Sequence, residues 1–162
     1  MSISIIVAIA ENNAIGLKNK LLWHISEDMK RFKRITMGHK VIMGRNTYLS
    51  LPFRPLAGRT NIIISDKPEE KFEGCITVYS VEQALEMCPD DEECFVIGGA
   101  MIYRQFLKYA KKLYVTRVFK SYDADTFFPE ISKDDWNETV IETYGPDGNN
   151  EFSYAFFIYE RK

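Results

Sequence analysis

The chain has few of the residues that build metal sites, disulfide frameworks or membrane spans. Its 162 residues include only two histidines and three cysteines, with no CxxC pair, so neither a zinc site nor a disulfide scaffold is expected. No apolar run approaches the roughly 20 residues that a membrane helix needs. The first residues lack a basic start and a small-residue cleavage site. These absences predict a metal-free cytoplasmic protein with reduced cysteines.

Positive charge is not in excess either. The 21 Lys and Arg against 23 Asp and Glu give a formal net charge of −2, which argues against a nucleic-acid binder with a broad basic surface. Apolar residues make up 46% and charged residues 27% of the chain, an ordinary globular composition. The length fits one domain over residues 1–162. We expect a monomer that meets anionic ligands through a few well-placed basic side chains.

What the chain does have is an alternation of short apolar runs with helical patterns. Strands are predicted over 2–10, 40–44, 60–65, 75–79 and 93–99, and helices over 26–36, 46–51, 81–88 and 100–108. The strands are mostly apolar on both faces, as a sheet covered by helices on both sides requires. The alternation predicts parallel strands joined by right-handed crossovers.

The C-terminal third lacks the intervening helices. Three further strands are predicted over 112–119, 137–145 and 152–160, and "PDGNN" at 146–150 is a strong turn signal. The predicted fold class is therefore α/β: a single domain with a mostly parallel central sheet, helices on both faces and a C-terminal antiparallel hairpin.

Asp28 interrupts the apolar side of the helix over 26–36. At 100° per residue that side consists of Ile25, Met29, Phe32 and Ile35. Burying a carboxylate there costs several kcal/mol unless it is paired. Either Asp28 is a first-turn acid that complements the helix dipole behind a Ser26 cap, or it binds a ligand that offers two N–H donors, since no lysine or arginine shares the stripe.

Two strands end in a glycine and lead directly into a helix. The first junction reads "GRNT" (44–47), with Arg45 and Thr47, and the second reads "VIGGAMIY" (96–103). Free N–H groups at a helix start suit a phosphate, and glycine allows close approach to the backbone. Either junction alone is a weak signal, and a single pair of glycines before a helix is more often a tight turn than a cofactor site. Together, at the carboxyl ends of adjacent parallel strands, they predict a dinucleotide site.

Two loop segments carry further candidates. The connection over 10–24 shows little regular pattern, and loops of that length are often lids over a site. Trp23 near its end either packs in the core or orders a water beside a carboxylate. Arg59, in "LPFRPLAGRTN" (51–61), is either a carboxylate-binding residue or an ordinary loop arginine.

These segments resemble dihydrofolate reductases of the bacterial chromosomal type over essentially the whole chain. The segments that carry the resemblance are "AIAENNAIG", "LLWHISEDMKRFK", "VIMGRNTYLSL", "RPLAGRTNIIIS", "VIGGAMIYRQF", "LYVT" and "DADTFFP". The resemblance implies NADPH-dependent reduction of 7,8-dihydrofolate to 5,6,7,8-tetrahydrofolate, which supplies one-carbon metabolism. It also implies that antifolate inhibitors bind the substrate site.

The resemblance implies a role for each side chain around the pterin. Asp28, with Thr116 beside it, would hold ring nitrogen 3 and the 2-amino group and raise the basicity of nitrogen 5, while a water beside Leu21 delivers the proton. The implied catalytic residues are Asp28, Trp23, Leu21, Thr116 and Tyr103. The implied substrate-binding residues are Ile6, Val7, Asp28, Met29, Phe32, Leu51, Leu56, Arg59 and Ile97.

The resemblance also assigns both glycine junctions to NADPH. Arg45 would meet the adenosine 2′-phosphate, and Gly98 and Gly99 would form a cis peptide at the pyrophosphate. The implied cofactor-binding residues are Ala8, Ile15, Gly16, Asn19, Gly44, Arg45, Asn46, Thr47, Ser65, Asp66, Lys67, Gly98, Gly99, Ala100, Met101, Ile102, Tyr103 and Thr126.

The chain departs from the family pattern at three positions. Leu22 stands before Trp23 where the family usually has proline, and Met101 replaces a polar or basic residue. Asp66 stands where a hydroxyl residue is common; because a carboxylate repels a phosphate, NADPH preference would rest on Arg45 and Lys67. Two rival functions remain: the pyrimidine reductase of riboflavin biosynthesis and a nucleotide-binding regulator without catalysis. Asp28 together with Arg59 favours folate.

Overall fold

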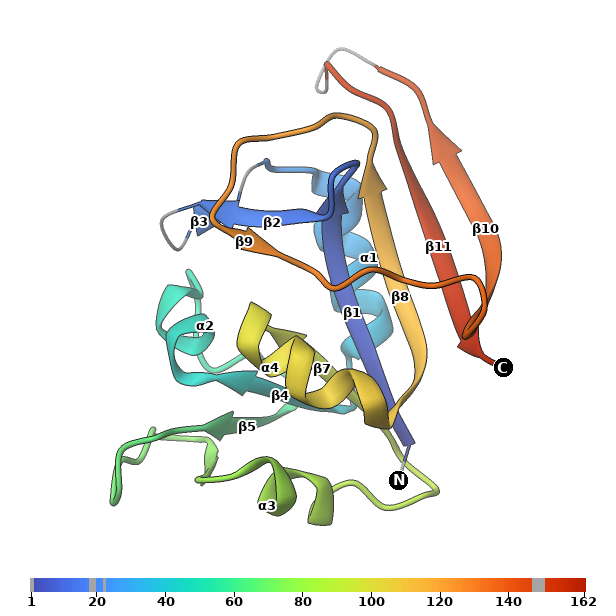
Figure 1. Ribbon diagram of the computed structural model, residues 1–162. Coiled ribbons are helices and arrows are strands. Elements are labelled where there is room, and N and C mark those ends of the chain that lie inside the picture. The colour runs from blue at the N-terminus through green and yellow to red at the C-terminus, as the bar shows by residue number, and fades with distance from the viewer. Residues whose placement is uncertain (1, 18–19, 22, 147–150) are drawn as a thin grey trace.

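The computed structural model describes residues 2–17, 20–21, 23–146 and 151–162. Its main feature is one sheet of eight strands in the order β10-β11-β8-β1-β7-β4-β5-β6 (Figure 1). The strands are β1 (Ser2–Ala10), β4 (Lys40–Gly44), β5 (Thr60–Ile64), β6 (Ile76–Val78), β7 (Glu93–Gly98), β8 (Ala110–Val118), β10 (Trp136–Tyr144) and β11 (Tyr154–Arg161).

The strands run in the directions that the sequence predicts. All neighbours from β8 to β6 are parallel, whereas β11 pairs antiparallel with both β8 and β10. The predicted α/β fold with a C-terminal antiparallel hairpin is therefore confirmed. Four of the five residues of the predicted hairpin turn, 147–150, lie outside the described residues.

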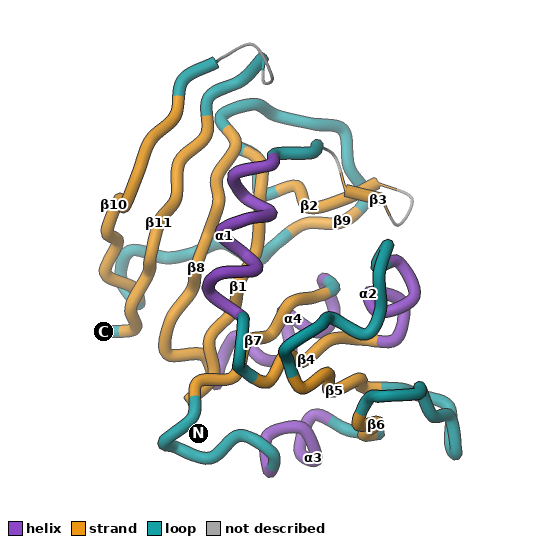
Figure 2. The backbone as a smooth tube through the Cα atoms, turned by 180° about the vertical axis from the view of Figure 1, so that it is seen from behind, coloured by secondary structure: helices purple, strands orange, loops and turns teal. Residues whose placement is uncertain are grey.

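Helices cover both faces of the sheet. They are α1 (Ser26–Thr36), α2 (Arg45–Ser50), α3 (Val81–Glu86) and α4 (Ala100–Phe106), the last followed by the 3₁₀ turn η1 (Leu107–Tyr109). Helix α4 lies in front of β1 and β7 in Figure 1, whereas α1 lies in front of β1 and β8 when the molecule is seen from behind in Figure 2. The predicted helices and main-sheet strands match these elements to within two residues at each end.

Strand β1 separates two hydrophobic layers. Ile3, Ile5 and Ile9 belong to a buried cluster that includes Tyr103 of α4, whereas Ile6 belongs to another, against which Phe32 of α1 packs. Alternate side chains of a strand point to opposite faces, so one apolar strand contributes to both layers. This explains the continuous apolar run at the start of the chain.

A second, small sheet forms where the sequence indicated an irregular loop. Strands β2 (Ala14–Leu17), β3 (Lys20–Leu21) and β9 (Thr126–Phe127) pair antiparallel in the order β3-β2-β9. The expectation of little regular structure over 10–24 is thus wrong for part of that segment. Its partner β9 lies more than a hundred residues along the chain, so no local pattern could predict the pairing.

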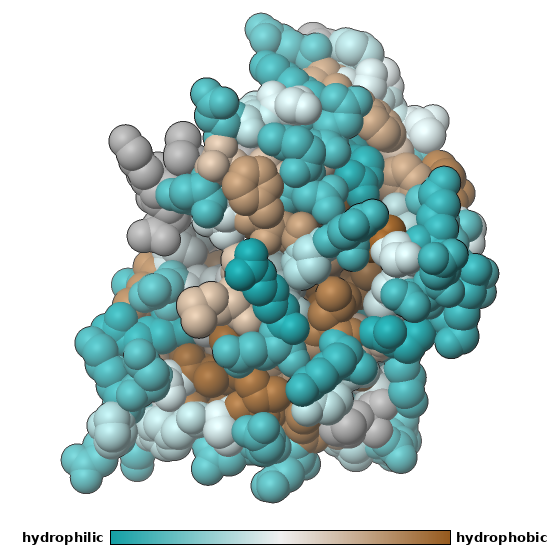
Figure 3. Space-filling view, in the orientation of Figure 1, coloured by the Kyte–Doolittle hydropathy of each residue, from teal (hydrophilic) through white to brown (hydrophobic). Residues whose placement is uncertain are grey.

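The surface is ordinary for a globular chain. Hydrophilic side chains cover most of the face in Figure 3, and hydrophobic ones gather mainly in its lower half. Within the described ranges, none of the helices has the length and apolar character needed to cross a bilayer. Cys75, Cys88 and Cys94 are all free thiols.

Candidate active site

Asp28 lies in the first turn of α1 together with Glu27. The expected Ser26 cap is wrong: Ser26 is already helical, the preceding Ile25 takes the N-cap position, and no side chain caps the helix. The carboxyl group of Asp28 instead accepts a hydrogen bond from Thr116 Oγ1 of β8 over 2.5 Å. Asp28 is therefore the first-turn acid that one alternative expected, but its carboxyl group is also held by a strand of the main sheet.

The surroundings of Asp28 favour its neutral form. Burial raises the pKa of this carboxyl group above its ordinary 3.8, while the hydrogen bond from Thr116 and the charge of Arg31 act in the opposite direction. Burial is the largest of the three effects. A ligand that offered further N–H donors would compensate this carboxylate for the water that it has lost.

Arg31 corrects one expectation from the sequence. The apolar stripe was predicted to hold no basic residue, yet Arg31 is only 5% exposed. Its guanidinium carbon lies 4.3 Å from the ring centroid of Phe156, and its charge interacts with Asp28. Residues three apart on a helix are neighbours, so the spacing from Asp28 was the available signal.

Several predicted substrate residues line one side of the sheet near Asp28. Ile6 is buried in the cluster on the α1 face, and the half-buried members packed against that cluster include Phe32, Leu51, Leu56 and Ile97. Met29, on the same helix, is 50% exposed. Val7 is not brought together with them, because its side chain belongs to the cluster on the opposite face. The result is a partly open apolar surface.

Arg59 is held at one end of this surface. Its Nε donates to the Ala57 carbonyl over 2.9 Å and its Nη1 to Thr36 Oγ1 over 3.1 Å. Its guanidinium carbon lies 6.0 Å from the Phe32 ring centroid. Partial burial lowers its pKa below the ordinary 12.5, but the group remains fully charged at neutral pH. The chain thus fixes one cation beside the apolar residues.

Trp23 packs against the edge of a separate cluster. Its ring centroid lies 5.4 Å from that of Tyr122, and both are half-buried against buried Ile25, Val118 and Phe156. The packing alternative for Trp23 is therefore confirmed for one side of its ring. Its role in ordering a water stays a prediction. Asn19 and the side chain of Leu21 lie outside the described residues, although the Leu21 backbone pairs with Gly16.

Tyr103 joins the two central strands beneath the site. Its hydroxyl lies 3.0 Å from the Ile6 carbonyl oxygen of β1 and 2.8 Å from the Ile97 carbonyl oxygen of β7. Burial and the nearby charge of Asp28 both raise its pKa above the ordinary 10.0. The hydroxyl therefore stays protonated and links the middle of β1 to the end of β7, just before the glycine junction.

The two glycine junctions lie side by side, as predicted. The peptide between Gly98 and Gly99 is cis, and a Cβ on Gly99 would lie 3.4 Å from Thr47 Oγ1 of the other junction. A Cβ on Gly44 would lie 3.1 Å from Ile102 Cγ1 of α4. A side chain at Gly44 would press on Ile102, whereas one at Gly99 would only touch Thr47, so the two junctions are packed against each other.

Arg45 is paired with an acid that the sequence did not single out. Its Nε lies 3.0 Å from Oε1 and 2.8 Å from Oε2 of Glu70, and the hydroxyl of Ser65 also donates to Glu70. These two donors lower the pKa of Glu70 below its ordinary 4.5. Asp66 and Lys67 are exposed beside them, and the Lys67 N–H donates to Ser65 Oγ over 3.1 Å.

The remaining predicted cofactor residues lie on several elements. Gly16 of β2 pairs with Thr126 of β9 in the small sheet. Met101 at the start of α4 is 72% exposed. Half-buried positions are held by Ala8, Ile15, Ala100 and Ile102, whereas Asn46 is exposed.

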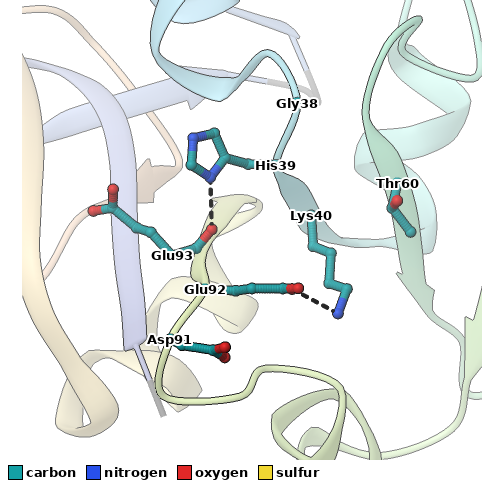
Figure 4. Close-up of a pocket in the computed structure, with 7 residues that line it drawn as sticks. All are labelled: Gly38, His39, Lys40, Thr60, Asp91, Glu92 and Glu93. Atoms are coloured by element: carbon teal, nitrogen blue, oxygen red, sulfur yellow. Dashed lines mark hydrogen bonds and ion pairs between the residues drawn. The ribbon is translucent and has the colours of Figure 1, made fainter.

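A hollow of about 350 Å³ lies elsewhere, at the amino ends of β4 and β7 (Figure 4). His39 Nδ1 lies 2.9 Å from the Glu93 carbonyl oxygen, and Lys40 Nζ lies 2.9 Å from a Glu92 carboxylate oxygen. Ligands of open α/β sheets bind at the carboxyl ends of the strands. Because its basic groups are paired within the protein, this hollow is not a candidate active site.

Comparison with known proteins gives one consistent result. The sequence model of the family described as "Dihydrofolate reductase" matches residues 2–161. The dihydrofolate reductase of Bacillus subtilis is 41% identical over 160 residues, covering 99% of this chain and 95% of that protein. That of Neisseria gonorrhoeae is 47% identical over 138 residues, 85% of each chain.

A solved structure is similar over almost the whole fold. Dihydrofolate reductase from Enterococcus faecalis, complexed with NADP(H) and the compound RAB-propyl, matches with a TM-score of 0.87 and 30% sequence identity. The match covers 99% of this chain and 96% of the other.

Proposed function

The chain belongs to the dihydrofolate reductase family, and we propose that it divides the family's reaction between Asp28 at one end of the site and Arg45 at the other. It is an NADPH-dependent oxidoreductase that reduces 7,8-dihydrofolate to 5,6,7,8-tetrahydrofolate. The observation that carries the division is the half-buried carboxyl group of Asp28, which accepts a hydrogen bond from Thr116 and whose pKa is raised by the loss of water around it.

At the substrate end, Asp28 binds and orients the pterin. Its carboxylate accepts hydrogen bonds from ring nitrogen 3 and the 2-amino group, while Thr116 holds one of its oxygens over 2.5 Å. Phe32, Leu51 and Leu56 cover the apolar part of the substrate. Arg59 pairs with a carboxylate of the glutamate tail, a match that its fixed guanidinium supports.

The charge of Asp28 also assists the proton transfer. When bound, NADPH supplies the hydride that reduces carbon 6 of the substrate. Asp28 holds the far edge of the ring, so its carboxylate does not reach nitrogen 5 but raises its basicity through the ring, and a water delivers the proton. Removal of bulk water strengthens this effect, because the surroundings of Asp28 already have a low polarity.

At the other end, the donors present fit NADPH. The bare backbone at Gly98 and Gly99, close to Thr47, suits a pyrophosphate that approaches the chain closely. Arg45 and Ser65 both donate to the carboxylate of Glu70, so the two side chains form a donor pair that suits an anion. These residues would bind and orient the cofactor, with Arg45 meeting the 2′-phosphate.

The same proposal includes the number of domains, the oligomeric state and the cellular compartment of the chain. A single domain over residues 1–162 is supported by the main sheet, which contains both β1 and β11. A monomer without nucleic-acid partners fits a formal net charge of −2, and a reducing cytoplasm fits three free thiols. Sedimentation velocity tests the monomer directly.

The reaction is tested by the loss of reduced-nicotinamide absorbance when purified protein meets NADPH and dihydrofolate. We expect loss that depends on both compounds, and inhibition by an antifolate. Turnover of a ribosylated aminopyrimidine instead of dihydrofolate would support the riboflavin-pathway reductase. Binding of NADP⁺ with no turnover of either substrate would support a regulator.

A further inference from the structure

Glu70 occupies a position that the reaction does not explain. Its carboxylate contacts Arg45 Nε through both oxygens, at 3.0 and 2.8 Å, and also accepts the hydrogen bond of Ser65. Arg45 is the residue proposed to meet the 2′-phosphate, and Ser65 lies beside it at the carboxyl end of β5. An acid of the chain itself therefore holds the donors that the cofactor needs.

This contact is more specific than a surface ion pair. The side chains of Arg45 and Glu70 are only 29% and 18% exposed. The backbone of Glu70 is also held: its carbonyl accepts from the Tyr79 hydroxyl over 2.9 Å, and its N–H donates to the Lys67 carbonyl over 3.2 Å. The segment thus fixes one carboxylate against two donors, whereas most exposed ion pairs are loosely held.

A carboxylate and a phosphate compete for such donors. A phosphate monoester carries more charge than a carboxylate and offers three acceptor oxygens, so it would take over the hydrogen bonds of Arg45 and Ser65. Glu70 would then lose its partners while standing next to a second anion. The binding free energy of the 2′-phosphate is reduced by that loss.

We propose that Glu70 sets the cofactor selectivity of the enzyme by acting as an internal competitor of the 2′-phosphate. The proposal rests on the proposed function, because it concerns the same Arg45 site. For a cofactor that has a 2′-hydroxyl in place of the phosphate, Glu70 keeps its partners, and a carboxylate is also the group that accepts a hydrogen bond from a ribose hydroxyl. Glu70 therefore narrows the difference in affinity between NADPH and NADH.

The test is calorimetric binding of NADP⁺ and NAD⁺ to the intact protein and to Glu70→Gln. Glutamine has the same shape and keeps one acceptor oxygen but has no charge, so its contact with Arg45 is weaker. We expect NADP⁺ to bind about five- to tenfold more tightly to the variant, the size of a charge-assisted contact that is partly exposed. NAD⁺ should bind equally or more weakly. Adenosine 2′,5′-bisphosphate should follow NADP⁺, and adenosine 5′-monophosphate should follow NAD⁺.

Two further variants isolate the contact. Glu69→Gln removes the same charge from an exposed neighbour. It should change the affinities for NADP⁺ and NAD⁺ less than about twofold, and it measures the effect of the lost charge acting at a distance. In an Arg45→Ala background, Glu70→Gln should no longer tighten NADP⁺ binding, because the shared donor is gone.

The outcomes are distinct. Tighter NADP⁺ binding in Glu70→Gln alone supports the proposal. Unchanged or weaker NADP⁺ binding, in a protein whose wild type reduces dihydrofolate, overturns it and makes Glu70 a support that orients Arg45. A wild type that neither reduces dihydrofolate nor binds NADP⁺ would refute the proposed function itself, and the competitor role with it.

Discussion

Two carboxylates at the two ends of the site have opposite surroundings. Asp28 is half-buried and accepts a hydrogen bond from Thr116, and its pKa is raised chiefly by the loss of water around it. Glu70 is held by Ser65 and both of its oxygens contact Arg45, and its pKa is lowered by these donors. Burial dominates at the first position and hydrogen bonding at the second.

The two carboxylates would respond to ligands in opposite ways: Asp28 would gain hydrogen bonds from the pterin, whereas Glu70 occupies the donors that the 2′-phosphate would use. Loss of water disfavours the charged form of Asp28, so N–H donors from a pterin edge would relieve an existing cost. Glu70 already has the donors that a phosphate would require, so ligand binding disrupts an existing contact. The same side-chain chemistry therefore favours one ligand and opposes the other.

The largest expected effect comes from Asp28→Asn. The amide keeps the acceptor for Thr116 but removes the charge that is proposed to bind the pterin edge and assist protonation. We expect dihydrofolate turnover at pH 7 to fall by roughly 100-fold or more, the range for the loss of a general acid–base or electrostatic group. Steady-state kinetics with NADPH and dihydrofolate measures the change.

The matched measurement is NADP⁺ binding by the same variant. It should stay within about twofold of wild type, because Asp28 and Arg45 are independent sites. Near-normal turnover would remove Asp28 from the mechanism, and an equal loss of cofactor binding would mean that the substitution damages the fold.

The next largest effect is expected at Arg45, the partner of Glu70. Arg45→Ala removes the cation that holds Glu70 and is proposed to meet the 2′-phosphate, so NADP⁺ affinity should fall about 10- to 100-fold, as for a lost charge-assisted contact. NAD⁺ affinity should fall less than about threefold, since its ribose carries no phosphate. Calorimetry measures both, and Arg34→Ala, an exposed arginine of α1, is the control. Equal losses for the two cofactors would show that Arg45 does not distinguish them.

The sequence predicted the fold and the Asp28 end well for a physical reason. Strand and helix ranges follow from apolar periodicity, which is local, and their alternation implies the parallel sheet. Asp28 stood out because a charged residue in an apolar stripe is anomalous on the helix itself. The two glycine junctions came together because neighbouring parallel strands place their carboxyl ends at one edge.

The misses have different causes. Arg31 lies three residues beyond Asp28, so the helix spacing was sufficient to identify it. Glu70 gave no such signal, because its contact with Arg45 depends on how the segment after β5 folds back. The pairing of β2 with β9 likewise depends on residues far apart in the chain. Long-range contacts of loops are therefore the part that the sequence did not predict.

Arg31→Met sharpens the account of Asp28. Burial raises the pKa of Asp28, and the Thr116 hydrogen bond and the Arg31 charge reduce that rise. Removing the charge should raise the pKa further, so the pH below which activity is lost should move upward. Methionine retains most of the packing against Phe156. The pH dependence of kcat/KM measures the shift, and Lys30→Met, on the exposed side of α1, should leave it unchanged. A midpoint that does not move would mean that solvent screens Arg31 from Asp28.

The smallest effects are on stability, and they should have opposite signs. Ionised Asp28 costs the fold stability, a cost that appears as pH rises from 3.8 through the raised pKa. Asp28→Asn should therefore raise Tm at pH 7 by about 2–4 °C, the shift for roughly 1 kcal/mol in a chain of this length, and by less below pH 3.8. Ionised Glu70 instead stabilises the fold above pH 4.5, and this is lost as pH falls through its lowered pKa. Glu70→Gln should thus lower Tm at pH 7 and not in acid. Scanning calorimetry at both pH values measures these changes in Tm. Changes of the same sign at pH 7 in the two variants would mean that ionisation of Asp28 and ionisation of Glu70 do not have opposite effects on stability.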